Sequence, residues 1–231
     1  MKKFYQIYQY IMPLIFFPIA VYLWRIRLED NYRAIFLVLS VPIIVSYIVP
    51  AVGTNCLKLW EFKTKFTLGK FRPQHGFLFG TATSLLTLIC LTDNSQITLL
   101  SIFQFGFILA AVLGFWNWIY DIYAIKSKFM IVYNIRYFKG ESAEAIATDY
   151  APVYFGMFGF IYGIEIQLTQ LLLEKLDNDL FFGLIIIIFY IIALIVPTLT
   201  YVWFSYLKYG ELGLKSYNNV GKEERNENNF Y

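Results

Sequence analysis

The sequence predicts an all-α protein, a polytopic transmembrane bundle of about six spans. The 231 residues are 58% hydrophobic and only 15% charged, and their mean hydropathy is +0.55. Soluble domains carry about 25% charged residues. Six apolar stretches approach the roughly 20 residues that a helix needs to cross the hydrocarbon. Lysines and arginines gather beside these stretches and form no soluble basic patch, which argues against nucleic-acid binding.

The six expected spans cover residues 6–24, 34–53, 75–92, 98–122, 151–173 and 180–207. The first is not a signal peptide, because its apolar stretch is too long and ends at Trp24-Arg25 without a small-residue cleavage site. Residues 1–210 are expected to form a single transmembrane domain, and residues 211–231 a polar cytoplasmic tail.

The distribution of positive charge predicts the orientation. Of the 19 lysines and arginines, 15 fall in segments that are cytoplasmic if both termini are cytoplasmic. The positive-inside rule therefore favours this multi-pass orientation in an inner or plasma membrane. The outer connections are short, whereas the two inner ones, 54–74 and 126–150, are long. Long connections on a rigid scaffold often carry function, so we expect a site on the cytoplasmic side.

The two long inner loops resemble each other. The stretches from Leu59 to Gly69 and from Phe129 to Gly140 both mix aromatic or aliphatic residues with basic ones and lead into an outward span. Interfacial segments have this composition, and so do unrelated amphipathic loops. If the loops form a repeat, the second and third spans and the fourth and fifth spans are two parallel, duplicated hairpins around a shared interior.

The span 98–122 carries the clearest helical pattern. Gly106, Ala110, Gly114, Asn117 and Asp121 share one face, on which small residues lead down to an amide and a carboxylate. A carboxylate in a span usually faces a partner or a watery cavity, so Asp121 is a candidate catalytic acid and Asn117 a candidate substrate-binding residue. Solvation of Asp121 at the cytoplasmic interface is the alternative.

Aromatic side chains surround this pair. Trp116, Trp118 and Tyr120 lie beside it, and Trp60 belongs to the first inner loop. Tryptophan and tyrosine favour the headgroup level, which is sufficient reason for such a belt. Their faces can also stabilise a carbocation or contact an isoprenoid chain, so all four are candidate substrate-binding residues.

The span 151–173 carries two further candidate acids. Asp149 precedes the span, where Pro152 favours a helix start, and it is either a catalytic acid or the helix cap. Glu165 lies roughly 20 Å from the inner end of the span and is either a proton-coupling acid or a helix–helix hydrogen-bonding group. Gly159 and Gly163 form a close-packing pattern.

His75 is the only histidine. A cluster of histidines around iron is therefore excluded, and the two cysteines, Cys56 and Cys90, are too few for a zinc site or a disulfide framework. His75 is a candidate proton carrier or a polar anchor. Arg72 is a candidate for holding a phosphate or headgroup. No metal is expected, and the absence of nucleotide-binding motifs leads us to expect no cofactor.

Two stretches carry a family resemblance. The first contains Leu59-Trp60-Glu61-Phe62, Gly69 and Pro73-Gln74-His75-Gly76-Phe77-Leu78-Phe79, and the second runs from Asn117 through Asp121-Ile122-Tyr123-Ala124 to Gly140 and Tyr154-Phe155. Together they resemble the membrane lycopene cyclase domain of heterodimeric and fused carotenoid cyclases, over about residues 20–170. In that family each repeat has an aspartate near an inner helix end and an acid pair that opens the next helix.

This chain departs from the family at the acid pairs. His75-Gly76 stand at the first pair, Ala151-Pro152 stand at the second with Asp149 nearby, and Asp121 keeps the aspartate of the second repeat. The resemblance implies proton-initiated cyclisation or isomerisation of a polyene without redox change. Here His75, Asp121 and Asp149 would take over the proton chemistry.

Three functions follow from these observations. The first is an enzyme or binding protein that acts on an isoprenoid, a carotenoid-like molecule or another long apolar lipid. The second is a small-solute or ion transporter or channel, with Glu165 and Asp121 on its path. The third is a non-catalytic assembly subunit in a homo- or hetero-oligomer.

Overall fold

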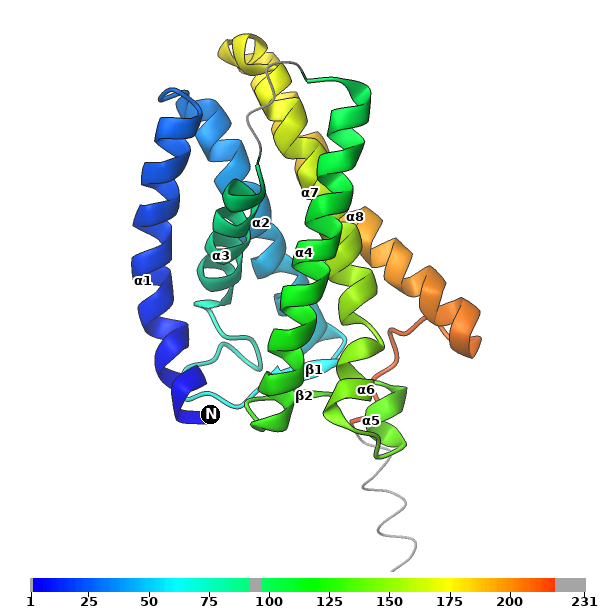
Figure 1. Cartoon of the computed structure of the whole chain (residues 1–231). Coiled ribbons are helices and arrows are strands. Elements are labelled where there is room, and N and C mark those ends of the chain that lie inside the picture. The colour runs from blue at the N-terminus through cyan, green and yellow to red at the C-terminus, as the bar shows by residue number, and fades with distance from the viewer. Residues whose placement is uncertain (1, 92–96, 219–231) are drawn as a thin grey trace, which may run out of the picture.

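The computed structural model describes residues 2–91 and 97–218. Its long helices lie at the six expected spans (Figure 1): α1 (Lys2–Arg27), α2 (Tyr32–Ala51), α3 (His75–Cys90), α4 (Leu99–Lys126), α7 (Ala151–Leu171) and α8 (Asp179–Tyr209). Shorter elements connect them: η1 (Val52–Cys56), β1 (Trp60–Phe62), β2 (Met130–Val132), α5 (Ile135–Phe138), α6 (Ala143–Thr148) and η2 (Leu173–Asp177). The prediction of an all-α protein is confirmed.

Four of the helices are long and apolar enough to cross a membrane. These are α1, α2 with η1, α4 and α8. The chain is therefore a membrane protein by the length and composition of its helices. The helix α3 is apolar but has only 16 residues, and α7 includes the polar Glu165, Gln167 and Gln170. The count of six spans thus stays a prediction for α3 and α7.

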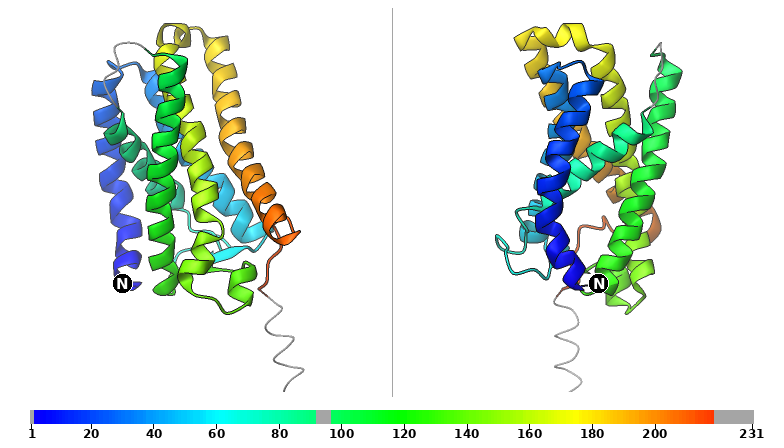
Figure 2. Two further views of the ribbon diagram at one scale, coloured as in Figure 1. Left: turned by 45° about the vertical axis from the view of Figure 1, so that its right-hand side comes forward. Right: turned by 60° about the vertical axis from the view of Figure 1, so that its left-hand side comes forward.

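The helices associate as two hairpins. The most extensive interface joins α4 to α7, and the next joins α2 to α3. The helix α1 packs on α3, while α8 packs on α7 and α2, so that α1 and α8 lie at opposite edges of the bundle (Figure 2). These pairs are the ones that the sequence predicts if the inner loops form a repeat, and the duplication itself stays a prediction.

Small residues bring α4 and α7 together. A Cβ atom on Gly159 would lie 2.4 Å from the backbone oxygen of Leu109, and one on Gly163 would lie 2.9 Å from the Cα atom of Gly106. These backbones touch because neither glycine has a side chain. The close-packing patterns predicted for the two helices are therefore confirmed.

Between the hairpins, the hydrophobic core fills the half of the bundle away from the N-terminus. Its buried members include Trp24, Leu109, Leu113 and Tyr162. The Trp24 Nε1–H donates to Ser84 Oγ at 2.6 Å. Because the indole N–H is paired, so large a side chain is buried here without an unsatisfied donor.

The two inner loops contain short strands that the sequence did not predict. Each contributes a three-residue strand, and β1 and β2 pair antiparallel with Trp60 opposite Val132 and Phe62 opposite Met130. The strand β1 follows α2, and β2 follows α4. We call the end that carries this pair the inner end, following the predicted orientation.

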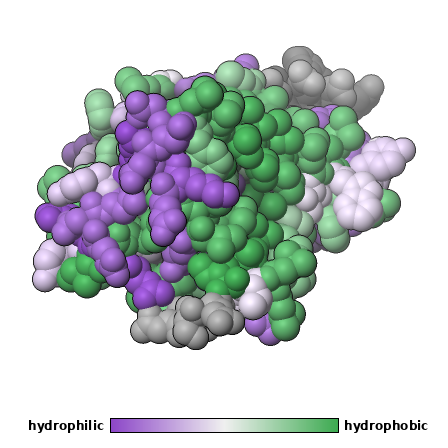
Figure 3. Space-filling view, turned by 90° about the horizontal axis from the view of Figure 1, so that it is seen from above, coloured by the Kyte–Doolittle hydropathy of each residue, from purple (hydrophilic) through white to green (hydrophobic). Residues whose placement is uncertain are grey.

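The opposite end, which we call the outer end, carries the connections from α1 to α2 and from α7 to α8. Seen from this side, a hydrophilic patch lies beside apolar side chains (Figure 3). Two exposed ion pairs belong to these connections, Arg25–Asp30 at 2.7 Å and Arg33–Asp179 at 2.6 Å. The second pair joins the start of α2 to the start of α8.

Candidate functional site

A cavity of about 340 Å³ lies in the inner half of the bundle, between the two hairpins. Its walls come from the end of α2 and η1, the start of α3, the end of α4, the start of α7 and the second half of α8, and β1 and β2 also contribute to its lining. Most of the lining side chains are aliphatic or aromatic. Ligand pockets of about 300 to 1,000 Å³ with such a lining commonly hold small apolar molecules.

Trp60 forms part of the cavity wall because the residue that its ring packs against is a glycine. The ring lies on Gly53 of η1, where an added Cβ atom would be 2.1 Å from a ring carbon. The π-helical turn of η1 continues α2, and its residues Val52 and Gly53 also line the cavity. Such widened turns recur at functional sites.

A carboxyl group and an amide lie at one edge of the cavity. Asp121 is 6% exposed, and the hydroxyl of Tyr150 donates to its Oδ2 at 2.7 Å. One turn earlier on α4, Asn117 Nδ2 donates to the carbonyl oxygen of Leu113 at 2.9 Å. Tyr120 also lines the cavity. The last turns of α4 thus supply the carboxyl group and one amide of a mostly apolar lining.

Arg72 is fully buried behind this edge. Its guanidinium carbon lies 4.1 Å from the ring centroid of Phe62 and 5.1 Å from that of Phe129. Its Nε–H donates to His75 Nδ1 at 3.0 Å. Its terminal nitrogens lie near Tyr120 but, within the described residues, have no hydrogen bond of good geometry. Aromatic faces therefore stabilise much of the charge.

Glu61 lies on β1, outside the helices. Lys63 and Lys70 both pair with its carboxylate, Lys70 at 2.6 Å. Burial would raise the pKa of Glu61, but the two ammonium groups and the hydroxyl of Tyr133 together lower that pKa to about 2. This cluster fastens β1 to the loop that leads into α3.

The most exposed part of the lining comes from the end of α2 and from η1. Ile48, Val52 and Leu57 are 42%, 44% and 36% exposed. These residues lie on the side of the bundle near its inner end.

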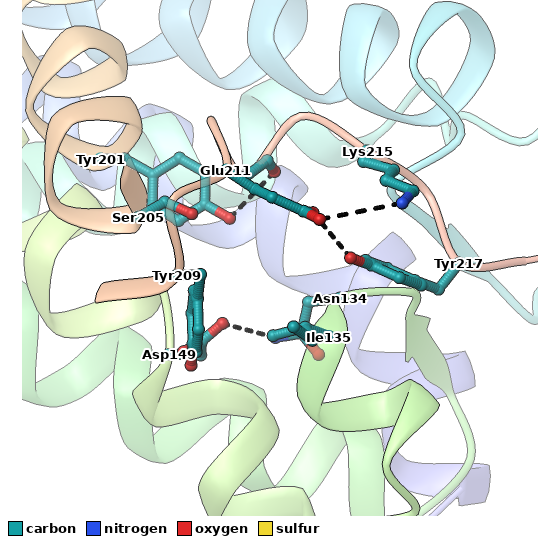
Figure 4. A pocket seen from close by; sticks show the side chains of 10 residues that line it. Asn134, Ile135, Asp149, Tyr201, Ser205, Tyr209, Glu211, Lys215 and Tyr217 are labelled. Atoms are coloured by element: carbon teal, nitrogen blue, oxygen red, sulfur yellow. Dashed lines mark hydrogen bonds and ion pairs between the residues drawn. The ribbon is translucent and has the colours of Figure 1, made fainter. Parts of the chain in front are cut away.

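Residues 210–217, which we call the strap, follow α8 along this end of the cavity. Gly213 and Leu214 of the strap line the cavity, and Tyr201 of α8 donates from its hydroxyl to the carbonyl oxygen of Gly213 at 3.1 Å (Figure 4). Gly213 has a φ of +70°, a backbone conformation that favours glycine.

The end of the strap touches both inner loops. The backbone N–H of Tyr217 donates to the carbonyl oxygen of Tyr133, next to β2, at 2.9 Å. The hydroxyl of Ser216 donates to the carbonyl oxygen of Lys58, just before β1, at 2.6 Å. The strap therefore joins the two hairpins at the inner end. Of the tail predicted as residues 211–231, residues 219–231 lie outside the described part.

Asp149 lies in a smaller neighbouring pocket (Figure 4). Lys208 donates to it at 2.7 Å, Asn134 at 3.4 Å, and the hydroxyl of Tyr209 also donates to it. The cap interpretation is wrong, because Tyr150 occupies the cap position of α7 and makes no side-chain capping bond. The carboxylate of Asp149 instead joins the start of α7 to the end of α8.

The structure brings half of the sequence-predicted residues together at the cavity. These are Trp60, His75, Asn117, Tyr120 and Asp121. Four others lie elsewhere near the inner end. Arg72 lies behind His75, Asp149 in the neighbouring pocket, Trp116 is 54% exposed, and Trp118 donates from Nε1 to Thr148 Oγ1 at 2.9 Å.

Glu165 lies apart from the cavity, in the core toward the outer end. It is 4% exposed, and within the described residues neither of its carboxylate oxygens has a hydrogen-bond partner. Gln167 Oε1 is likewise buried without a partner there. Glu165 lines neither the cavity nor the smaller pocket beside it.

Sequence reasoning missed several lining residues. Tyr150, Tyr154 and Phe158 follow one another at intervals of four and line one wall, and Tyr150 is the hydrogen-bond partner of Asp121. That spacing was available as a signal for a shared helix face. Phe79 also follows His75 at an interval of four, and the two rings stack at 4.4 Å.

Comparison of this chain with family models, with curated proteins and with solved structures finds no match. Across residues 2–91 and 97–218, no group of three or more histidine, cysteine, aspartate or glutamate side chains is placed to hold a metal ion. The cavity's own residues are therefore the basis for a functional proposal.

Proposed function

We propose that this membrane protein binds a long apolar lipid of the isoprenoid kind in the cavity and transfers a proton to it from Asp121. The observation that carries the proposal is an apolar cavity that opens on the side of the bundle and has one carboxyl group, that of Asp121, in its described lining. A ligand of this class partitions into the bilayer and reaches the opening from there.

The proposed chemistry is an isomerisation or cyclisation without redox change. Protonation of an alkene by the Asp121 carboxyl group forms a C–H bond and a carbocation, and loss of another proton from the carbocation to the carboxylate restores the acid. The faces of Trp60, Phe79 and Tyr120 line the cavity and would stabilise the cation. The hydroxyl of Tyr150 holds one carboxylate oxygen, which leaves the other for the ligand.

The proposal extends to the architecture. We propose that α3 and α7 also cross the membrane, as part of a six-span bundle, and that the hairpins α2–α3 and α4–α7 are a duplicated unit. The antiparallel pairing of β1 with β2, each directly after the first long helix of its hairpin, supports this proposal. The resemblance to the lycopene cyclase domain likewise remains a proposal.

The test is the isoprenoid profile of cells that express the chain, measured by mass spectrometry of lipid extracts and of lipid that co-purifies with the protein. We expect a changed isoprenoid in cells with the native chain and its loss with Asp121→Asn. Glu165→Gln is the matched control, because this carboxyl group lies outside the cavity. An unchanged profile and no co-purified isoprenoid would contradict the proposal and favour an assembly subunit.

A further inference from the structure

His75 presents a fixed hydrogen-bond donor to the cavity. The Arg72 Nε–H donates to His75 Nδ1 at 3.0 Å, and a guanidinium group does not lose its proton in proteins. Nδ1 must therefore be the unprotonated nitrogen, so the proton of the neutral imidazole lies on Nε2. A second proton on Nδ1 would face the N–H of Arg72.

The ring is held in this orientation from two sides. It stacks on Phe79 with centroids 4.4 Å apart and lies 5.2 Å from the ring of Phe62, which also packs on Arg72. His75 lines the cavity, and within residues 2–91 and 97–218 its Nε2–H has no hydrogen-bond acceptor. His75 is 8% exposed, and a donor in an apolar cavity is costly to leave unpaired once a ligand has displaced water from it, which indicates that the bound molecule supplies an acceptor.

Further polar groups lie along the same edge. Phe79 stacks against His75 on one side and meets the ring of Tyr120 at 4.9 Å on the other. Next to Tyr120, the Oδ2 atom of Asp121 accepts from Tyr150, so Oδ1 carries the proton of the acid in the proposed function. One turn earlier, Asn117 donates from Nδ2 to its own helix, which leaves its Oδ1 atom as an acceptor. The polar edge therefore offers one fixed donor, one oxygen acceptor and the acid itself.

We infer that the ligand of this cavity is a long apolar molecule that ends in a hydroxyl group, such as an isoprenoid alcohol. Its oxygen accepts from His75 Nε2–H, and its O–H donates to Asn117 Oδ1. A hydrocarbon end would leave these buried groups unpaired, and an ether or ketone would pair only the donor. This inference rests on the proposed function and deepens it by naming the polar end of the ligand.

The experiment measures binding of three probes to the purified full chain in lipid nanodiscs by quenching of tryptophan fluorescence, to which Trp60 in the cavity contributes. The probes are geranylgeraniol, its methyl ether and the corresponding hydrocarbon. We expect the alcohol to bind about tenfold more tightly than the hydrocarbon, with the ether between them. The variant His75→Phe keeps a ring that can stack on Phe79 but loses the Nε2–H donor. It should therefore bind the ether and the hydrocarbon with equal affinity.

The variant Asn117→Val keeps the Arg72–His75 pair but loses the acceptor. Its affinity for the alcohol should fall toward its affinity for the ether, so this variant tests the inference even if His75→Phe does not fold. Phe115→Leu, on the exposed face of α4 and outside the cavity, is the matched control and should keep the wild-type order of affinities. Equal affinity of the wild-type chain for alcohol and hydrocarbon would overturn the inference and leave the apolar cavity of the proposed function intact. Binding of none of the probes would overturn both.

Discussion

Arg72 is the residue whose environment departs most from ordinary expectation. It is fully buried, and three aromatic rings, those of Phe62, Phe79 and Phe129, lie within 5.4 Å of its guanidinium carbon. A cation in such a place usually has a carboxylate partner. Here flat π faces and one imidazole nitrogen take that role, which suits the planar guanidinium and not the compact ammonium of lysine.

We predict that Arg72→Lys and Arg72→Met both lower the thermal stability of the detergent-solubilised protein. The loss of the stacking and of the bond to His75 should cost about 2 to 4 kcal/mol for either variant. Unfolding followed by tryptophan fluorescence measures the change. Arg25→Met removes an exposed ion pair and should shift the melting temperature much less. A stable Arg72→Lys variant would contradict the importance of planar stacking.

The lowered pKa of Glu61 predicts how the stability of the protein depends on pH. Its pKa falls from the ordinary 4.5 to about 2 in the folded chain, so the folded state binds this proton less tightly than the unfolded state does. The stabilisation is therefore complete above pH 4.5 and declines as pH falls toward 2. In Glu61→Gln this decline should be smaller, as measured by melting temperatures across that range. Identical pH profiles for both proteins would contradict the assignment.

At the residue scale, the sequence indicated which polar groups lie at the cavity better than it predicted their partners. Asp121, Asn117 and His75 were recognisable because polar residues in apolar spans are costly and need a reason. The partner of Asp149 was not predictable, since Lys208 is far away in the sequence and reaches it only after α8 has packed. The helix-cap signal at Asp149 was local and was overridden by that distant ion pair.

At the scale of elements, two glycines at the interface between α4 and α7 differ in the space that each leaves for a side chain. We predict that Gly159→Ala destabilises the protein by about 1 to 3 kcal/mol, because its Cβ would lie 2.4 Å from the rigid backbone oxygen of Leu109. Gly156→Ala is the control, since its Cβ would lie 3.6 Å from Ala110 O, an ordinary contact. Melting temperatures in detergent would measure both, and equal effects would contradict the packing.

The long helices were predictable and the strands were not. A run of about 20 apolar residues encodes a helix locally, because each backbone group must pair within the segment. Strands of three residues carry no such signal, and β1 and β2 exist only because the two hairpins place them side by side. The cavity depends on that same arrangement, so its approximate position was predictable from the two long inner loops, but its lining from α8 was not.

At the scale of the whole molecule, labelling of the two native cysteines tests the predicted orientation of the protein in the membrane. Cys56 is exposed in η1 at the inner end, and Cys90 ends α3 toward the outer end. In a Cys90→Ser chain, we predict that a membrane-impermeant maleimide labels Cys56 in inside-out vesicles and fails to label it in right-side-out vesicles. A chain that also carries Cys56→Ser is the control for background labelling. The reverse pattern would contradict the predicted cytoplasmic termini.

The strap also sets the order in which the protein can be completed during synthesis. Lys58 and Tyr133 leave the ribosome long before Ser216 and Tyr217, so the two backbone oxygens that the strap binds wait for their donors until residues 210–217 have been made. Until then the inner end of the cavity lacks Gly213 and Leu214. The wall of the cavity is therefore completed only after both hairpins and α8 have been synthesised.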